Sequence, residues 1–231
     1  MHGGWQVTSI QVNESDPENV SVVDYFPGYP RGFYRAVLAD PPWSFKTYSG
    51  PKVPARGKQP YPVMDVEEIA ALPIGDLCEP NAVLFLWMTW PTLQDAMWVI
   101  TRWGFKYKTC AFCWTKASNR QLDMFQDDLE GTIGTGYWTR SNSEACLLAT
   151  RGHPKRLDAS VRQAIIAPRR QHSRKPEVVH GRIEQLVAGP YLELFARRRH
   201  LGWDAWGNET DMKYGRNDGG DLQNPMEQEP S

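Results

Sequence analysis

The sequence predicts an α/β protein with a mostly parallel sheet and helices on both faces. Short continuous apolar runs such as Ala36–Ala39 and Ala82–Met88 are typical of strands that are covered on both sides. Segments with helical spacing lie between such runs, and strands that alternate with helices indicate a parallel sheet. The chain has 231 residues, which fits one domain with a substantial core.

The helix signals follow the strands along the chain. Asp65 is followed three residues later by Glu68, which is the spacing of a capping box and predicts a helix start. Pro91 suits the first turn of the next helix, and Gly104 ends that helix. Its apolar face is predicted to consist of Leu93, Ala96, Met97 and Ile100. Pro176 begins a further helix.

The remaining segments complete a single-domain organisation. Further strands are predicted at Tyr107–Trp114, Ala145–Thr150 and Tyr191–Ala196. The polar, glycine-containing stretch 115–142 predicts a long loop, and loops of this length in compact domains are usually functional or disordered. Residues 1–32 predict an irregular lead-in, residues 33–209 the folded domain, and the acidic residues 210–231 a disordered tail.

Composition excludes several classes of protein. No apolar run approaches the ~20 residues that span a bilayer, and no secretory signal is visible, so we expect a cytoplasmic protein without a membrane partner. Cys110 and Cys113 form a lone C-x-x-C, and we expect no metal site because structural zinc requires four ligands. The net charge is −1, but residues 151–175 contain eight Lys or Arg and one acid, which predicts phosphate contacts.

The most informative feature is a predicted buried strand that ends in Asp40, Pro41, Pro42 and Trp43. Ligands of parallel α/β sheets bind beyond the carboxyl ends of the strands. The Asp40 carboxylate accepts hydrogen bonds, and the prolines present carbonyls at a fixed φ without N–H groups of their own. Trp43 adds a flat apolar face. This combination predicts an acceptor-rich socket for a planar ring that carries an NH₂ group, such as a nucleobase.

An exocyclic amine is a poor nucleophile because its lone pair is delocalised into the ring. Rigid acceptors for both of its N–H bonds favour the form with a localised lone pair, which can attack an electrophilic methyl group in line. Positioning and pre-aimed dipoles then accelerate the transfer. The alternative interpretation is a tight turn after a strand, in which Asp and Pro are ordinary turn residues.

With this motif the chain resembles the adenine-N6 methyltransferases related to the catalytic subunit of the eukaryotic mRNA adenosine methyltransferase. The resemblance covers residues 37–209. Four further motifs match in order: "LFLWMT" (Leu84–Thr89), "GYWTRSNSEACLLATRG" (Gly136–Gly152), "SRKPEVVHGRIEQLV" (Ser173–Val187) and "LELFARRRHLGWDAWGNE" (Leu192–Glu209). The resemblance implies a Rossmann-like methyltransferase that uses S-adenosylmethionine (SAM), in which the catalytic motif precedes the SAM-contacting strand.

The resemblance also implies roles for individual residues. Residues 40–43 take the catalytic position, and Asp40 also contacts the cofactor. Lys175 matches a lysine that binds the SAM carboxylate, and its place just before a helix start favours an anion, although it could be an exposed lysine of a basic run. The other implied cofactor contacts are Arg197, His200, Asn208 and Glu209. Tyr61 and Glu144 match residues at the substrate base.

The sequence departs from the family pattern at some of these positions. Ala196 replaces a glycine, His200 an asparagine and Glu209 a glutamine, so the closing segment could also be a solvated basic strand end. A buried Glu144 needs a partner, which Arg140 or a substrate amine could supply. Trp138 is either a stacking platform or a packing residue.

These observations predict an enzyme that methylates the 6-amino group of adenine in nucleic acid. The size of the chain favours DNA over RNA, as in a bacterial or phage enzyme. A non-catalytic nucleic-acid-binding subunit of a methyltransferase complex is the alternative, and a homodimer or heterodimer is compatible with either. The chain lacks the glycine-rich G-x-G-x-x-G loop, which disfavours an enzyme that uses a dinucleotide.

Overall fold

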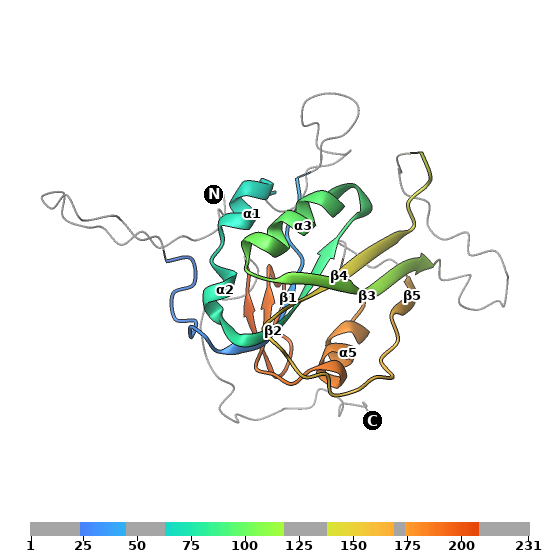
Figure 1. Cartoon of the computed structure of the whole chain (residues 1–231). Coiled ribbons are helices and arrows are strands. Elements are labelled where there is room, and N and C mark those ends of the chain that lie inside the picture. The colour runs from blue at the N-terminus through green and yellow to red at the C-terminus, as the bar shows by residue number, and fades with distance from the viewer. Residues whose placement is uncertain (1–23, 45–62, 118–137, 169–173, 208–231) are drawn as a thin grey trace, which may run out of the picture.

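The computed structural model of the chain describes residues 24–44, 63–117, 138–168 and 174–207. Their centre is a seven-stranded sheet with the order β5-β3-β4-β2-β1-β6-β7 (Figure 1). The strands are β1 (Tyr34–Ala39), β2 (Cys78–Met88), β3 (Lys106–Ala117), β4 (Ser143–Arg151), β5 (Ala164–Pro168), β6 (Tyr191–Leu194) and β7 (Trp203–Trp206). β4 runs antiparallel to β2 and β3, and the other neighbouring pairs are parallel. The prediction of a mostly parallel sheet is confirmed.

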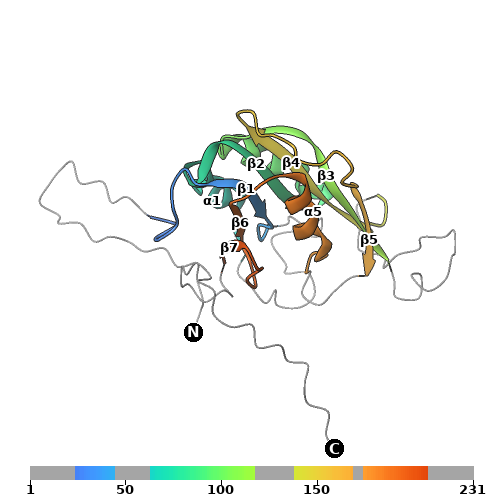
Figure 2. The same ribbon diagram turned by 90° about the horizontal axis from the view of Figure 1, so that it is seen from below.

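Helices cover both faces of this sheet, as predicted. Val37 and Ala39 of β1 point to one face, where they belong to the same apolar cluster as Ile69 of α1 (Val66–Ala71) and Ile100 of α3 (Leu93–Arg102). Leu38 points to the other face and joins the cluster that contains the apolar side of α5 (Val178–Leu186). Figure 1 shows α1 and α3 above the sheet and α5 below it, and Figure 2 views the molecule from the α5 side.

The helix boundaries reflect local signals in the sequence. The predicted capping box is present: the Asp65 backbone N–H donates to Glu68 Oε2 at 2.8 Å. Pro91 lies in a short 3₁₀ helix, η1 (Trp90–Thr92), that leads into α3. Beyond α3, Gly104 adopts a φ of 80°, a conformation that favours glycine. α5 begins two residues after Pro176, so its predicted start was slightly early.

Three short elements were absent from the prediction: α2 (Ile74–Leu77), β5 and β7. β5 and β7 are the two outermost strands of the sheet and have five and four residues, respectively. β7 (Trp-Asp-Ala-Trp) has no continuous apolar run, and the short run of β5 (Ala-Ile-Ile-Ala-Pro) is only partly buried, as is usual for an outermost strand. None of the helices in the described part of the chain has the length and apolar character needed to cross a bilayer.

The direction of the strands brings distant residues together at one edge of the sheet, namely the edge formed by the carboxyl ends of the parallel strands. β1, β2 and β6 are parallel, so the segments that follow them begin at the same edge. β4 runs the other way, so its first residues lie at this edge, opposite the last residues of β2 and β3. Asp40, Glu144 and Lys116 therefore come from separate strands to one place.

The segments that follow β6 and β7 approach each other closely at Gly207. The Ala196 backbone N–H donates to the Trp206 carbonyl at 2.9 Å. A Cβ atom added to Gly207 would lie 2.0 Å from the Ala196 carbonyl oxygen, which is far inside van der Waals contact. Only glycine permits this approach, which also sets the position of Arg197, the residue after Ala196.

We expect Gly207→Ala to lower the free energy of unfolding by about 1–3 kcal/mol, since the added methyl group must displace backbone atoms. Gly181→Ala is the matched control, because a Cβ at this helical position of α5 meets no atom within 4 Å. That variant should keep or raise stability by up to about 1 kcal/mol, because alanine favours a helix over glycine. Denaturant unfolding measures both, and equal stabilities would contradict the close approach.

Candidate active site

The motif after β1 is held rigidly by hydrogen bonds. The Trp43 backbone N–H donates to the Pro41 carbonyl at 2.8 Å, and the Met64 N–H donates to the Pro42 carbonyl at 3.0 Å. Both prolines are buried. The sequence suggested that both carbonyls would be available to a ligand, but in the structure each one already accepts a backbone N–H. Each carbonyl oxygen keeps a second lone pair, which is what remains for a ligand.

Trp43 lies in the core rather than presenting a stacking face. Its side chain is 6% exposed and belongs to the cluster under α1 and α3. The indole N–H donates to the Trp87 carbonyl at 3.0 Å. The expectation of a flat face beside the socket was wrong in this respect, because the ring is used to anchor the motif to β2.

Lys175 is the hub of the polar cluster at the edge of the sheet. Its Nζ lies 2.8 Å from both carboxylate oxygens of Asp40 and 3.2 Å from Glu144 Oε2. It also lies 5.4 Å above the ring of Trp87, a cation–π distance. The side chain of Lys175 is 17% exposed, so it is not the exposed lysine of a basic run.

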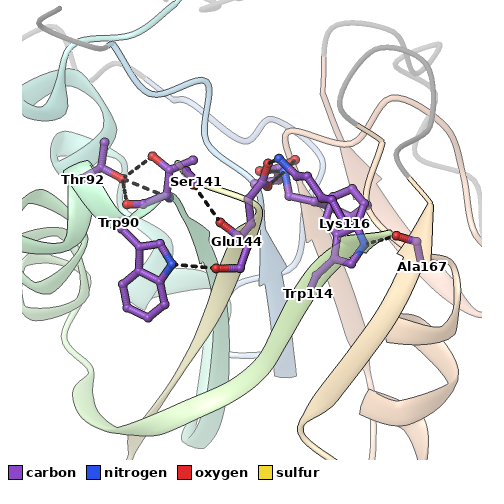
Figure 3. Close-up of polar contacts among 11 residues, drawn as sticks. Trp90, Thr92, Trp114, Lys116, Ser141, Glu144 and Ala167 are labelled. Atoms are coloured by element: carbon purple, nitrogen blue, oxygen red, sulfur yellow. Dashed lines mark hydrogen bonds and ion pairs between the residues drawn. The ribbon is translucent and has the colours of Figure 1, made fainter. Parts of the chain in front are cut away.

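Glu144 is buried, and two lysines neutralise it. Lys116 Nζ, which lies beside Glu144 in Figure 3, donates to Glu144 Oε1 at 2.5 Å. Lys175 binds the other oxygen of Glu144. The sequence had suggested Arg140 or a substrate amine as the partner, but the structure places two lysines there. Two carboxylates and two ammonium groups thus form a cluster of no net charge, which satisfies the requirement that buried charges be paired.

The cluster shifts the ionisation of its members in different directions. Burial raises the pKa of Asp40 above its ordinary value and outweighs the ion pair with Lys175, which opposes it. Burial acts in the same sense on Glu144, but Lys175 and Lys116 together prevail and lower its pKa. Burial alone would lower the pKa of Lys175, and the two carboxylates reverse this, so its pKa is raised. The Asp40 side chain keeps 31% of its surface accessible, which leaves it within reach of a ligand.

The predicted cofactor residues after β6 occupy two environments. The positive charge of Arg197 favours a lower pKa for Asp40, so this residue lies in the vicinity of the cluster. His200 instead stacks on His180 of α5 at 4.1 Å, and its Nε2 lies 3.7 Å from Glu184. Burial and the neighbouring His180 lower the pKa of His200. The structure therefore places His200 against α5, and its cofactor contact stays a prediction.

Several predicted residues are not placed by the structure. Tyr61, Asn208 and Glu209 lie outside the described residues, as do parts of the predicted lead-in and loop and the whole of the predicted tail. Their roles stay predictions. Trp138 is described and is 96% exposed, so within the described residues it does not pack as a core side chain.

The basic segment 151–175 serves more than one purpose. The Arg151 guanidinium donates to the Gly75 carbonyl and has a structural role, and Arg174 pairs with Glu177. Lys175 belongs to the buried cluster. Of the residues described, Lys155, Arg156 and Arg162 are exposed. Phosphate contacts are thus predicted for a smaller set of side chains than the charge count suggested.

Sequence reasoning missed Lys116 and Trp87 as parts of the site. Both lie on the face of the sheet that α5 covers, and Trp87 has the same strand parity as its buried neighbours in β2. Lys116 follows Trp114 by two residues, so continued alternation along β3 would have placed it on the same face. Its contact with Glu144 depends on the antiparallel register of β3 and β4, where Trp114 is opposite Glu144.

The fold and the site together define a Rossmann-like α/β protein in which the Asp-Pro-Pro-Trp motif precedes the last parallel strands. The family model MT-A70 matches residues 34–209, about three quarters of the chain, and the chain belongs to this family. "Type II methyltransferase M.MunI" from Mycoplasma is 29% identical over 204 residues, which are 80% of this chain and 82% of that protein.

Longer eukaryotic proteins are similar over the same domain. "N(6)-adenosine-methyltransferase MT-A70-like" from Arabidopsis thaliana is 29% identical over 186 residues, and the human "N(6)-adenosine-methyltransferase catalytic subunit METTL3" is 28% identical over 184 residues. Each match covers 78% of this chain but only 24% of the plant protein and 29% of the human protein. The similarity to these proteins is therefore restricted to one part of each.

We expect Glu144→Gln to lower the free energy of unfolding at pH 7 by about 3 kcal/mol, because it leaves two buried lysines short of a counter-charge. A carboxylate with a lowered pKa stabilises the folded state above its ordinary pKa, and this stabilisation is lost as the pH falls. The difference between the variant and the parent protein should thus shrink below about pH 4.3.

Glu79→Gln is the control for this measurement, because Glu79 pairs with Arg35 at 2.8 Å on the surface. Exposed pairs contribute at most about 1 kcal/mol, so this variant should be nearly as stable as the parent protein. Urea unfolding between pH 3 and 7 is the measurement. A loss at Glu144 that equals the loss at Glu79, or that does not change with pH, would contradict the buried cluster.

Proposed function

We propose that this protein is a SAM-dependent methyltransferase that modifies the 6-amino group of adenine in nucleic acid, with DNA as its substrate. The observation that carries the proposal is the accessible Asp40 carboxylate, which lies at the edge of the sheet in the family motif and is bound by Lys175. The names of the related adenosine methyltransferases support adenine as the target. The near-full-length match with a type II methyltransferase supports DNA.

The residues of the cluster suit the amino-acid end of SAM. That end carries a carboxylate and an ammonium group, and it requires a cation and an anion side by side. Lys175 and Asp40 form such a pair 2.8 Å apart, and the charge of Arg197 is close by. SAM, when bound, supplies a methyl group on a positively charged sulfur.

Lys175 links cofactor binding to the state of Asp40. An ammonium group has three N–H donors, and the two oxygens of Asp40 and one of Glu144 lie in position to accept them. A ligand carboxylate that binds Lys175 must replace one of these contacts. If the contact with Asp40 weakens, that carboxylate becomes available to accept hydrogen bonds from an amine.

The motif then acts on the target amine by positioning. Asp40 accepts one of its two N–H bonds and the second lone pair of the Pro41 or Pro42 carbonyl accepts the other, which favours the nucleophilic form of the nitrogen. Their hydrogen bonds to Trp43 and Met64 hold these acceptors still, so little reorganisation is required during the transfer. In a duplex the adenine must first leave the base stack to reach this edge.

The direct test is incubation with isotopically labelled SAM and single- or double-stranded DNA or RNA, followed by mass spectrometry of the nucleosides. We expect labelled N6-methyladenosine in its deoxy form. Asp40→Ala should reduce the rate at least 100-fold, because removal of one pre-aimed polar group at a reacting centre typically costs about 10²–10³ in rate. Its circular dichroism spectrum should match that of the parent protein.

Full activity of Asp40→Ala would refute the role of this carboxylate. A parent protein that binds DNA but shows neither methyl transfer nor a thermal shift with SAM would favour the non-catalytic subunit. Labelled RNA in place of labelled DNA would correct the substrate while leaving the reaction intact.

The proposed role of Lys175 predicts that its removal weakens SAM binding much more than DNA binding. We expect Lys175→Ala to weaken SAM binding about 10- to 100-fold, which corresponds to the loss of a hydrogen bond to a charged group. DNA binding should change much less. Lys155→Ala is the control, because this exposed lysine belongs to the predicted phosphate-binding segment and should affect DNA alone. Isothermal titration calorimetry with SAM and fluorescence anisotropy with DNA measure the two affinities, and the reverse ranking would overturn the assignment.

A further inference from the structure

Trp90 is an exposed aromatic residue with a fixed orientation. It begins η1, two residues after the end of β2, and 48% of its surface is exposed. Its indole N–H donates to the Ser143 hydroxyl at 3.0 Å. An exposed side chain that is held by a directed hydrogen bond loses little rotamer entropy when a ligand covers its ring. The ring of Trp90 is therefore organised for contact before any partner arrives.

The position of Trp90 relates it directly to the candidate active site. The register of β2 and β4 pairs Trp87 with Cys146 and Met88 with Ala145, and its continuation brings Trp90 opposite Ser143. Ser143 is the neighbour of Glu144 at the start of β4. The side chains of Ser143 and Glu144 project to opposite faces of the sheet, because successive residues of a strand alternate between its faces.

Figure 3 shows the consequence of this alternation at the edge of the sheet. Trp90 lies on one side of the start of β4, and Lys116 lies with Glu144 on the other side, toward α5. A base bound at Asp40 and Glu144 occupies the α5 side. A nucleic-acid strand that crosses the start of β4 from this side reaches the exposed ring of Trp90, which is bonded to Ser143.

We infer that Trp90 stacks against a base that flanks the target adenine and so positions the strand across the edge of the sheet. This inference rests on the proposed function and adds a second base-binding position to it. A tryptophan face accepts any base, so the contact contributes affinity and register without selecting a sequence. Ser143 acts through Trp90 by fixing the plane of its indole ring.

A protein partner is the competing occupant of this surface. Leu93 and Trp98 of α3 are also partly exposed, at 38% and 42%, and could extend an apolar patch from Trp90. A base is favoured at Trp90 because the ring is pinned to the residue that adjoins Glu144. Trp98 lies about two helical turns farther along α3 and provides a matched control of nearly equal exposure.

The test compares Trp90→Ala, Trp90→Phe and Trp98→Ala with the parent protein, using the DNA that the parent protein methylates. Loss of one stacked base typically weakens binding about 5- to 150-fold, so Trp90→Ala should raise the dissociation constant and KM for DNA by a factor in this range. Trp90→Phe should retain much of the affinity, and Trp98→Ala all of it. The affinity for SAM, measured by calorimetry, should be unchanged in all three variants.

A second comparison isolates the contact between the ring and the flanking base. DNA with an abasic residue on one side of the target adenine should bind the parent protein more weakly, on whichever side the stacked base lies. The same abasic DNA should bind Trp90→Ala as well as intact DNA does, because the contact is already lost. If Trp90→Ala and the abasic sites weaken DNA binding independently of one another, the inference is wrong. The proposed methyltransferase function would still stand in that case.

Two further outcomes separate the possible failures. If Trp90→Ala converts a dimer to a monomer in analytical ultracentrifugation and keeps the DNA affinity of the parent protein, Trp90 belongs to a protein interface and the inference is wrong. If the parent protein neither binds nor methylates any nucleic acid, the proposed function fails, and the role of Trp90 fails with it.

Discussion

The ammonium group of Lys175 joins the parts of the candidate site. It binds both oxygens of Asp40 after β1 and one oxygen of Glu144 in β4, and it lies over the ring of Trp87 in β2. A buried cation of this kind requires its carboxylates as much as they require it, because an unpaired charge in a medium of low dielectric constant is costly. The geometry of the cluster is therefore fixed by mutual neutralisation, with Lys116 completing the balance.

One reversed strand makes this arrangement possible. Because β4 is antiparallel to its neighbours, its first residues lie at the edge where β2 and β3 end. In a parallel strand, Glu144 would lie at the opposite edge, away from Asp40. The same reversal brings Ser143 opposite Trp90, so the start of β4 serves both faces of the sheet. The proposed catalytic cluster and the proposed stacking position of Trp90 thus both depend on the adjacent residues Ser143 and Glu144.

Hydrogen bonds explain why the Asp-Pro-Pro-Trp motif is rigid in the fold, although the sequence suggested that its polar groups were unengaged. From the sequence, the prolines presented unengaged carbonyls and Trp43 presented a free ring. In the fold, the Pro41 and Pro42 carbonyls each accept a backbone N–H, and the indole of Trp43 is packed under the motif and bound to the Trp87 carbonyl. Asp40 is left as the principal accessible acceptor. The motif therefore presents a carboxylate at the end of a strand, held in place by the hydrogen bonds of its neighbours, and does not present a stacking surface.

The central strands, the helix signals at Asp65 and Gly104, and the location of the motif at a strand end could all be predicted from the order of residues alone. These features follow from side-chain periodicity and from backbone preferences that act over a few residues. The short outermost strands and the partners of Glu144 became apparent only once the chain was folded. Lys175 and Asp40 are 135 residues apart, and their contact depends on the order and direction of the strands between them. No local pattern contains that information, because a charge requires a counter-charge without specifying where along the chain it is found.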